Sequence, residues 1–272
     1  MSKKAVIFLL GTLLAGGAVI AQEGGPQEAI TPEADTIGQE KRTDNFISDA
    51  RRSIEAREAL AARGGKDNVP GLQALIKAVG VTLPDPAFVE KSEQKEEIRE
   101  LFIRDVALRL ALLGHRPNEL RSRQSDANAL VQAAAASVRG NATLEQEMRL
   151  ADTVVFARIV EADLSDVRDD GFRSTLSVEV LRASKGAQAG DIVQIRQASG
   201  RDGDRAHFIG YDLIAPAGTE ILLVGSKAAY RDGRPGRAAS ADFVEPTIPM
   251  FIVEDGKLRG ESPKFAGQAL PF

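Results

Sequence analysis

Apolar side chains recur at two different spacings along this chain, and the change falls near residue 152. In residues 43–140 they recur every three to four positions, which is the spacing of a helix with one buried face. After residue 152 they alternate with polar residues, which is the spacing of a strand with one buried face. The pattern predicts an α+β protein in which an N-terminal helical bundle precedes a small antiparallel β-barrel.

About four helices are expected, at residues 44–63, 70–79, 85–113 and 125–138. Gly80 is predicted to end the second helix, and Gly114 to end the third, because glycine readily adopts the left-handed backbone of a C-terminal cap. Asp85 can accept hydrogen bonds at the start of the third helix. The fourth helix is rich in alanine, which permits close helix packing. The run Asn141-Ala-Thr143 has the spelling of a glycosylation sequon, and we interpret it instead as the boundary of the next helix.

Six or so short strands are expected, at residues 153–161, 172–181, 192–197, 220–225, 239–245 and 249–253. Glycine-containing turns separate them, and Asp255-Gly256 is the strongest hairpin signal among these turns. Short strands divided by such turns favour a small closed or partly closed barrel.

The strand region resembles a β-barrel module of exported bacterial proteins, similar in plan to the OB-like barrel of metalloproteinase inhibitors. The resemblance rests on the runs Leu150–Glu161, Val178–Arg182, Gly190–Arg196 and Gly218–Val224, within about residues 145–260. It implies an OB-like fold and an exported location. No inhibitory residue is carried over, because the matching residues are strand and turn residues and the disulfides of the animal inhibitors are absent.

The first 21 residues have the layout of a secretory signal peptide. Lys3 and Lys4 precede an apolar run that closes in small residues, so we expect cleavage after Ala21 and a mature chain that starts at Gln22. The alternative is a membrane anchor, but a spanning helix needs about 20 mostly apolar residues and this glycine-containing run is shorter.

The expected organisation is a signal peptide (1–21), a flexible leader (22–42), a helical region (43–140), a barrel domain (143–262) and a tail (263–272). The leader is rich in glycine, proline and acids, and too poor in large apolar residues to form a core. The last residues lack an alternating apolar pattern, so a frayed tail is predicted.

Composition excludes several classes of function. The net charge is −4, and neither half has the basic excess that a nucleic-acid-binding surface needs. Aromatic residues make up 5%, too few for extended stacking platforms on sugars or bases. The chain has no cysteine, which rules out disulfides, thiolate metal sites and a cysteine nucleophile.

The densest polar cluster on a predicted loop comprises Arg201, Asp202, Asp204, Arg205 and His207. Two carboxylates and an imidazole could bind a cation. The alternative is a solvated loop whose arginines neutralise its acids. The further oxygen ligands of an EF-hand calcium loop do not follow, so no metal site is assigned and the cluster is retained as a candidate interaction loop.

Two other positions carry potential chemistry. His115 follows the predicted C-terminus of a helix, where an imidazolium would suit the negative end of the helix dipole. Ser92 and Lys95 match the S-x-x-K spelling of penicillin-recognising enzymes, but no K-T-G or S-D-N follows. Neither position is assigned to catalysis.

The sequence therefore predicts an exported, soluble binding or protein-interaction protein of the bacterial envelope, without a catalytic residue or cofactor. Its partner would be another envelope protein or a small ligand, not nucleic acid, with no stable membrane insertion after cleavage. The alternative is an envelope hydrolase that uses the loop acids and His207. It would need two or more of four residues to converge in one concave pocket: Asp202, Asp204, His207 and Asp212. The oligomeric state stays open.

Overall fold

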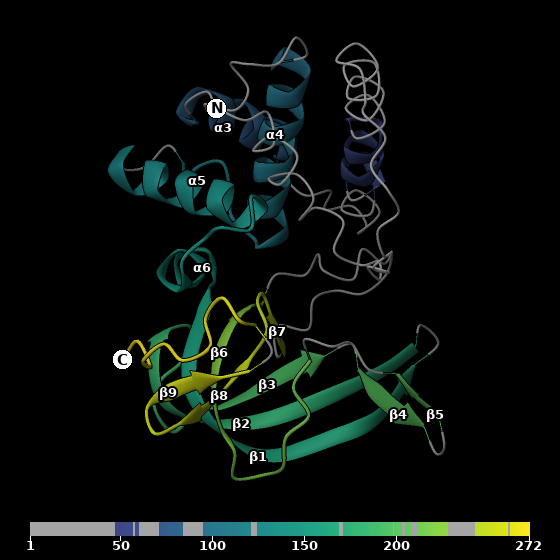
Figure 1. The fold of residues 1–272 in the computed structure, drawn as a ribbon, viewed down its shortest axis with the longest axis vertical. Helices are drawn as coiled ribbons and strands as arrows, with labels where there is room; N and C mark the ends of the chain where they lie inside the picture. Colours follow the sequence, from purple (N-terminus) through teal and green to yellow (C-terminus); the bar gives the residue numbers. More distant parts are fainter. Residues whose placement is uncertain are drawn as a thin grey trace, which may run out of the picture.

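The computed structural model describes residues 47–59 without 57, 71–83, 95–120, 124–168, 171–197, 199–202, 205–207, 212–227, 243–260 and 262–272. The predicted signal peptide, its cleavage site between Ala21 and Gln22, the leader and the helix cap Asp85 lie outside these residues. The described part combines helices with a closed five-stranded barrel, which confirms the α+β class (Figure 1).

The labelled helices are α3 (Leu72–Thr82), α4 (Lys95–Leu112), α5 (Gln124–Val138) and α6 (Leu144–Leu150), and residues 47–56 are also helical. Helices α3, α4 and α5 pack around one apolar core, which Leu75, Leu108 and Val131 share. A second, small core joins the 47–59 segment to α4 through Ile47, Ile54, Ile98 and Leu101. Figure 1 shows the helices gathered at one end of the barrel.

Two glycines test the predicted helix ends. Gly114 adopts a left-handed φ of 88°, and its N–H donates to Ala111 O while the next N–H donates to Leu110 O, which confirms the cap of α4. The predicted end at Gly80 is wrong, because α3 continues to Thr82. A Cβ at Gly80 would lie 3.7 Å from Ile103 Cδ1 of α4, which is an ordinary contact, so this position would also accept a side chain.

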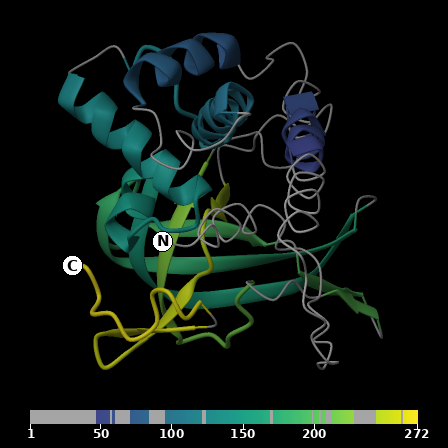
Figure 2. The ribbon, with the colours of Figure 1, turned by 45° about the horizontal axis from the view of Figure 1, so that its top comes forward.

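Helix α6 lies within residues 143–262, which were assigned to the barrel domain. Thr143 begins it with a complete capping box: its hydroxyl accepts from the Gln146 N–H, and the Gln146 side chain accepts from the Thr143 N–H. The predicted helix boundary at Thr143 is therefore confirmed. Figure 1 shows α6 between the other helices and the barrel, and Figure 2 shows the same helices and barrel from a second direction.

The strands are β1 (Thr153–Arg168), β2 (Gly171–Lys185), β3 (Ile192–Gln197), β4 (Gly200–Asp202), β5 (Arg205–His207), β6 (Glu220–Ser226), β7 (Phe243–Pro246), β8 (Phe251–Glu254) and β9 (Lys257–Arg259). The main sheet has the order β1-β2-β3-β7-β6-β8-β9, and pairing of β1 with β6 closes five of its strands into a barrel. The prediction of residues 192–197 as a strand is confirmed at both ends.

The prediction of a wholly antiparallel barrel is wrong at one seam, because β3 and β7 run parallel. The cause is geometric. A ring of five strands cannot alternate in direction all the way round, since an odd number of strands leaves one neighbouring pair pointing the same way. The other pairings of the ring are antiparallel.

The C-terminal residues are not a frayed tail. Leu258 N donates to Gln268 O and Gly267 N donates to Leu258 O, so the segment lies along β9. Phe265 is 4% exposed and packs edge-on against Phe251. The two-residue turn at Asp255-Gly256 has positive φ at both positions, which confirms the predicted hairpin.

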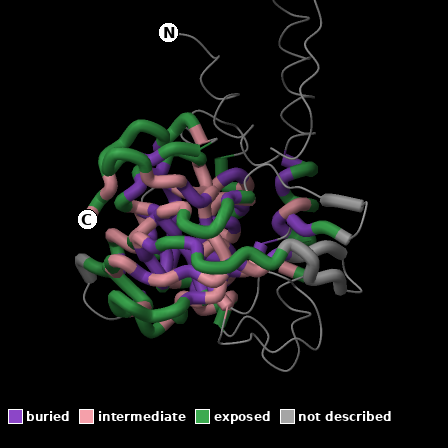
Figure 3. The backbone as a smooth tube through the Cα atoms, turned by 90° about the horizontal axis from the view of Figure 1, so that it is seen from below, coloured by how far each residue is buried: buried purple, intermediate pink, exposed green. Residues whose placement is uncertain are grey.

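The barrel has one core inside and another outside. Val155, Leu176, Ile195 and Leu223 belong to the inner core and are fully buried. The outer core lies where α6 and the C-terminal segment cover the start of β1 and the outer face of β6. Buried stretches accordingly concentrate within the barrel and the helical layer, and exposed stretches at the periphery (Figure 3).

Candidate functional site

The predicted interaction loop is a short β-hairpin. Among the described strands, β4 and β5 pair with each other, with Gly200 opposite His207, Arg201 opposite Ala206 and Asp202 opposite Arg205. Arg201 is exposed. Asp204 lies outside the described residues. Backbone pairing therefore brings four of the five predicted site residues into one small element, where sequence reasoning expected an irregular loop.

The described residues were compared with the two chemical roles considered for this cluster, a metal site and a hydrolase pocket. No group of three or more potential ligand residues occurs in the part of the chain that the structure describes. Asp212 has a structural role, because its Oδ2 accepts a 2.6 Å hydrogen bond from Ser199 N just before β4. The carboxylate thereby anchors the hairpin to the chain that follows it.

A buried amide completes this anchoring. Gln197, which is 2% exposed, accepts from Leu213 N at 2.7 Å and donates to Leu213 O at 2.9 Å. The side chain pairs with the backbone of residue 213 as a neighbouring strand would. Sequence reasoning missed Gln197, because its partner lies 16 residues further along the chain.

Strands β1 and β2 continue past the end of β3 as a two-stranded ribbon, here called the β1–β2 ribbon (residues 166–168 with 171–173). Pairing of β1 with β6 ends at Arg158, whereas pairing of β1 with β2 continues to Arg168 opposite Gly171. Figure 1 shows the ribbon running past the end of β3 toward β4 and β5. The predicted interaction hairpin thus lies beside this projection.

His115 links two helix ends. Its Nδ1 lies 2.9 Å from Glu119 Oε2, and its Nε2 lies 2.9 Å from the carbonyl oxygen of Leu150 at the end of α6. Both partners are acceptors, so an imidazolium can donate to both at once. The ring of His115 therefore contacts the C-terminus of α6, whereas the backbone N–H of His115 donates to Leu110 O at the end of α4.

Lys185 holds the other side of the same helix end. Its ammonium donates to Met148 O, Arg149 O and Ala151 O at 3.0–3.1 Å, three carbonyls at the end of α6. Burial, with a smaller effect of the Arg149 charge, lowers the pKa of Lys185. A cation at this position stabilises the negative end of the helix.

Asp152 connects the helices to the barrel at the same place. Its carboxylate accepts from Lys227 N, and its Oδ2 lies 3.0 Å from Ser226 Oγ, which is also 3.2 Å from Leu113 O. These polar groups form a junction that joins the helices to the barrel. The spacing of apolar residues did not predict it, because that spacing carries no information on polar contacts between distant residues.

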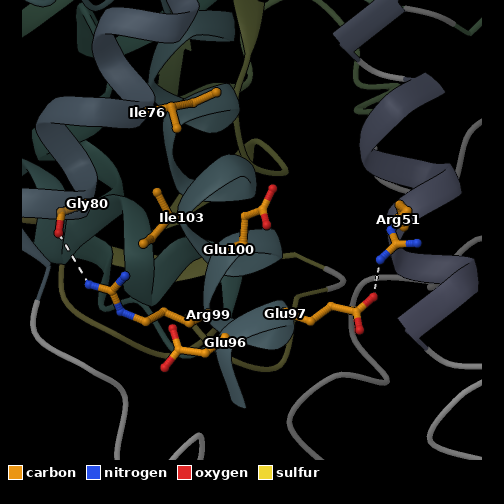
Figure 4. A pocket seen from close by; sticks show the side chains of 8 residues that line it. All are labelled: Arg51, Ile76, Gly80, Glu96, Glu97, Arg99, Glu100 and Ile103. Carbon is orange, nitrogen blue, oxygen red and sulfur yellow. Dashed lines mark hydrogen bonds and ion pairs between the residues drawn. The ribbon is translucent and has the colours of Figure 1, made fainter. Parts of the chain in front are cut away.

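A cleft of about 520 Å³ lies elsewhere, between the 47–59 segment and helices α3 and α4 (Figure 4). Ile76, Gly80 and Ile103 form its apolar part, and its charged lining is Arg51, Glu96, Glu97, Arg99 and Glu100. Arg51 pairs with Glu97 across the cleft, and Arg99 Nη2 lies 3.4 Å from Gly80 O. Ligand pockets are usually mostly apolar with a few polar groups, and this exposed, charge-rich cleft is not of that kind.

None of the predicted site residues lines this cleft. Ser92 of the S-x-x-K spelling lies outside the described residues, and Lys95 is the first residue of α4. Four of the predicted interaction residues thus lie together at the β4–β5 hairpin. His115 lies instead at the junction between the helices and the barrel, next to the end of α6.

No protein-family model, curated protein sequence or solved structure matches the chain. Among the helices that the structure describes, none has the length and apolar character of a membrane-spanning helix.

Proposed function

We propose that the mature protein is an exported binding module of the bacterial envelope, which holds another envelope protein on the outer surface of its barrel. One observation carries this proposal. The inside of the barrel is filled by its own apolar side chains, including Ile159, Val178 and Ile221, which are fully buried. A binding partner must therefore contact the outside.

The barrel plan supports the resemblance to OB-like modules. A five-stranded ring in the order β1-β2-β3-β7-β6, with one parallel seam, agrees with a Greek-key barrel of that kind. OB-folds bind their partners on the face of their second and third strands. We propose the same face as the binding face here. We also propose that the helical region forms a bundle, which the apolar core shared by α3, α4 and α5 supports.

The outer face of β2 and β3 offers polar groups for such contacts. Ser177 and Gln194 hydrogen bond across the two strands, and Arg196 stacks at 4.1 Å over the ring of Phe243. The exposed Ile192 adds an apolar contact at the start of β3. A mixed surface of this type is typical of a protein interface.

Export is tested first, by N-terminal sequencing of the protein from fractionated cells. We expect the mature chain to start at Gln22 and to be found in the soluble fraction. A chain that keeps Met1 or Ser2 and stays in the membrane pellet after salt extraction would overturn the signal-peptide assignment and favour the anchor.

Partner binding is tested by placing a photo-crosslinking amino acid at Glu179, on the outer face of β2. The matched control carries it at Glu145 on α6, whose side chain is 85% exposed. We expect a discrete cross-linked envelope protein from position 179 and none from position 145. Absence of any cross-link from position 179 in intact cells, or equal products from both positions, would overturn the proposed binding face.

A further inference from the structure

The segment at residues 47–59 contacts the other helices through one narrow apolar seam. Among its described residues, Ile47, Ala50 and Ile54 are buried, and they follow one another at spacings of three and four. This is the spacing of the seam residues in a coiled coil of two helices. Most of the other described residues of the segment are exposed. The seam therefore provides its apolar attachment.

The seam faces α4 and forms a small core of its own. Ile47 and Ile54 pack with Ile98 and Leu101, which lie three residues apart on α4. None of these four residues belongs to the core that α3, α4 and α5 share. A helix that is attached through a small, separate core opens at a lower free energy than helices that share the main core.

Two ion pairs flank the seam and fix the relative direction of the two helices. Arg51 pairs with Glu97, and Arg104 donates to both carboxylate oxygens of Glu58, at 2.6 and 3.1 Å (Figure 4 shows the first pair). Each pair joins residues that are 46 positions apart, so the two pairs lie one heptad apart on both helices. The helices therefore run parallel. The pairs occupy the flanking positions that set partner choice and orientation in coiled coils.

Exposure makes part of this attachment sensitive to salt. The side chains of Arg51 and Glu97 are 47% and 35% exposed, and ions in solution weaken an exposed pair. The charged cleft described above lies on the α3 side of the segment, so open space separates the segment from α3 there. The segment is thus attached to α4 by one small core and two ion pairs.

We propose that residues 47–59 form a displaceable clasp, which covers a helix-binding face of α4 and is replaced there by an amphipathic helix of a partner protein. The clasp shows what the face accepts. The partner helix runs parallel to α4, with apolar residues at spacings of three and four. It carries a base that meets Glu97 and, seven residues later, an acid that meets Arg104. This face is distinct from the proposed binding face on β2 and β3.

A second copy of this chain is a poorer occupant than a partner protein. Its segment 47–59 would make only the contacts that the clasp already makes. The clasp is tethered to the face that it covers, and tethering gives it a high effective concentration there. The same segment from a second copy lacks that advantage, so we expect the free protein to remain monomeric.

Hydrogen exchange of the full mature protein tests whether the clasp opens on its own. We expect the amides at 51–56, beyond the first turn of the segment, to exchange about tenfold faster or more than the slowest amides of α4 and α5. Raised salt should speed the exchange of the clasp further and leave α4 and α5 unchanged. Exchange of the clasp at the rate of α4, at both low and high salt, would overturn the proposal.

A fluorescein-labelled peptide of residues 46–60 probes the face itself by fluorescence anisotropy. Ile54→Asp in the full mature protein places a charge in the seam and should release the protein's own clasp. We expect saturable peptide binding to this variant, about tenfold tighter than to the wild-type protein, because the face no longer has to be vacated first. Absence of saturable binding, or equal binding to both proteins, would overturn the proposal. If circular dichroism shows that Ile54→Asp is unfolded, Arg51→Glu replaces it with the same expectation, since it changes an exposed side chain.

Glu97→Arg, added to the Ile54→Asp protein, tests the charge match. Glu96→Arg is the matched control, because both acids lie in the first turn of α4 and only Glu97 pairs with Arg51. We expect about fivefold weaker peptide binding for Glu97→Arg and unchanged binding for Glu96→Arg. A peptide with Arg51→Glu should restore binding to the Glu97→Arg protein. Equal effects of the two substitutions, or no restoration, would overturn the assignment to this seam.

Size-exclusion chromatography of the free protein tests the choice of occupant. We expect a monomer at all concentrations. A dimer that the wild-type protein forms and Ile54→Asp does not would identify a second copy as the occupant and overturn the partner-protein assignment. Failure of the cross-linking experiment at position 179 would overturn the proposed barrel face and leave the clasp intact, because the peptide experiment does not involve the barrel.

Discussion

Gly186 and Gly190 both adopt a left-handed backbone, with φ of 79° and 89°, but only Gly190 has room for a methyl group. A Cβ at Gly186 would lie 2.6 Å from Asp152 O, within the junction between α6 and the barrel, whereas one at Gly190 would meet nothing within 4 Å. Gly190→Ala should lower the free energy of unfolding by about 1 kcal/mol, the cost of the backbone strain alone. Gly186→Ala should lower it by about 3 kcal/mol or more. Urea unfolding of both variants measures the difference, and equal losses would show that residues 152–153 can move away.

Lys185 is the second residue whose role is open to direct test. Lys185→Met leaves three helix-end carbonyls without their donor and should lower the free energy of unfolding by about 1–2 kcal/mol. Lys257→Met, at an exposed lysine on β9, is the control and should have little effect. Equal stabilities of the two variants would contradict the capping role.

The pH dependence of the same variant follows from the lowered pKa of Lys185. A lysine whose pKa is lower in the folded chain binds fewer protons there than in the unfolded chain. The wild-type protein should therefore gain stability relative to Lys185→Met as the pH rises through the folded pKa toward 10.5, the usual lysine value. Urea unfolding of both proteins across the alkaline range measures this gain, which should be complete above the usual value.

At the scale of elements, α6 depends on its cap. A seven-residue helix is too short to be stable alone, so the capping box at Thr143 and packing against the barrel must hold it. Thr143→Ala should lower stability by about 1 kcal/mol, and Thr143→Ser, which keeps the hydroxyl, should lower it much less. Urea unfolding measures both. A full loss in the serine variant would show that the methyl group, and not the cap, carries the effect.

The pattern of neighbouring residues predicted those elements whose pairing or capping depends on residues close to one another in the sequence. Residues 192–197 were predicted at both ends, and Asp255-Gly256 supplies the backbone that its own two-residue hairpin needs. Gly80 misled the prediction because a glycine is tolerated inside a helix, and α3 continues through it to Thr82. The C-terminal segment was missed because its partner, β9, is recognised only through three-dimensional pairing.

The candidate site was predictable to a smaller extent. Arg201, Asp202, Arg205 and His207 were grouped by their nearness in sequence, and the hairpin keeps them together. The acceptor role of Asp212 and the strand-like role of Gln197 depend on partners more than ten residues away.

At the scale of the whole molecule, the helices and the barrel share a junction as well as having separate cores. Leu150 at the end of α6 belongs to the helical core, while Leu144 at its start belongs to the core outside the barrel. Arg109 of α4 reaches both Glu147 of α6 and Thr247 O at 3.4–3.5 Å. Helix α6 therefore couples the two parts, which the division into residues 43–140 and 143–262 did not anticipate.

A fragment of residues 143–272 tests how far this coupling extends. It retains α6, the closed barrel and the barrel's inner core, so we expect a soluble, β-rich fragment by circular dichroism that unfolds cooperatively. It loses the contacts of Leu150 with the helical core and of Ser226 with Leu113 O, so its melting temperature should lie roughly 10 °C below that of the mature chain. Adding back residues 95–142 should restore most of this difference, since they carry α4 and α5. A fragment that aggregates or lacks β structure would show that the helices complete the barrel's core, and one as stable as the mature chain would show that the junction contributes nothing to the barrel.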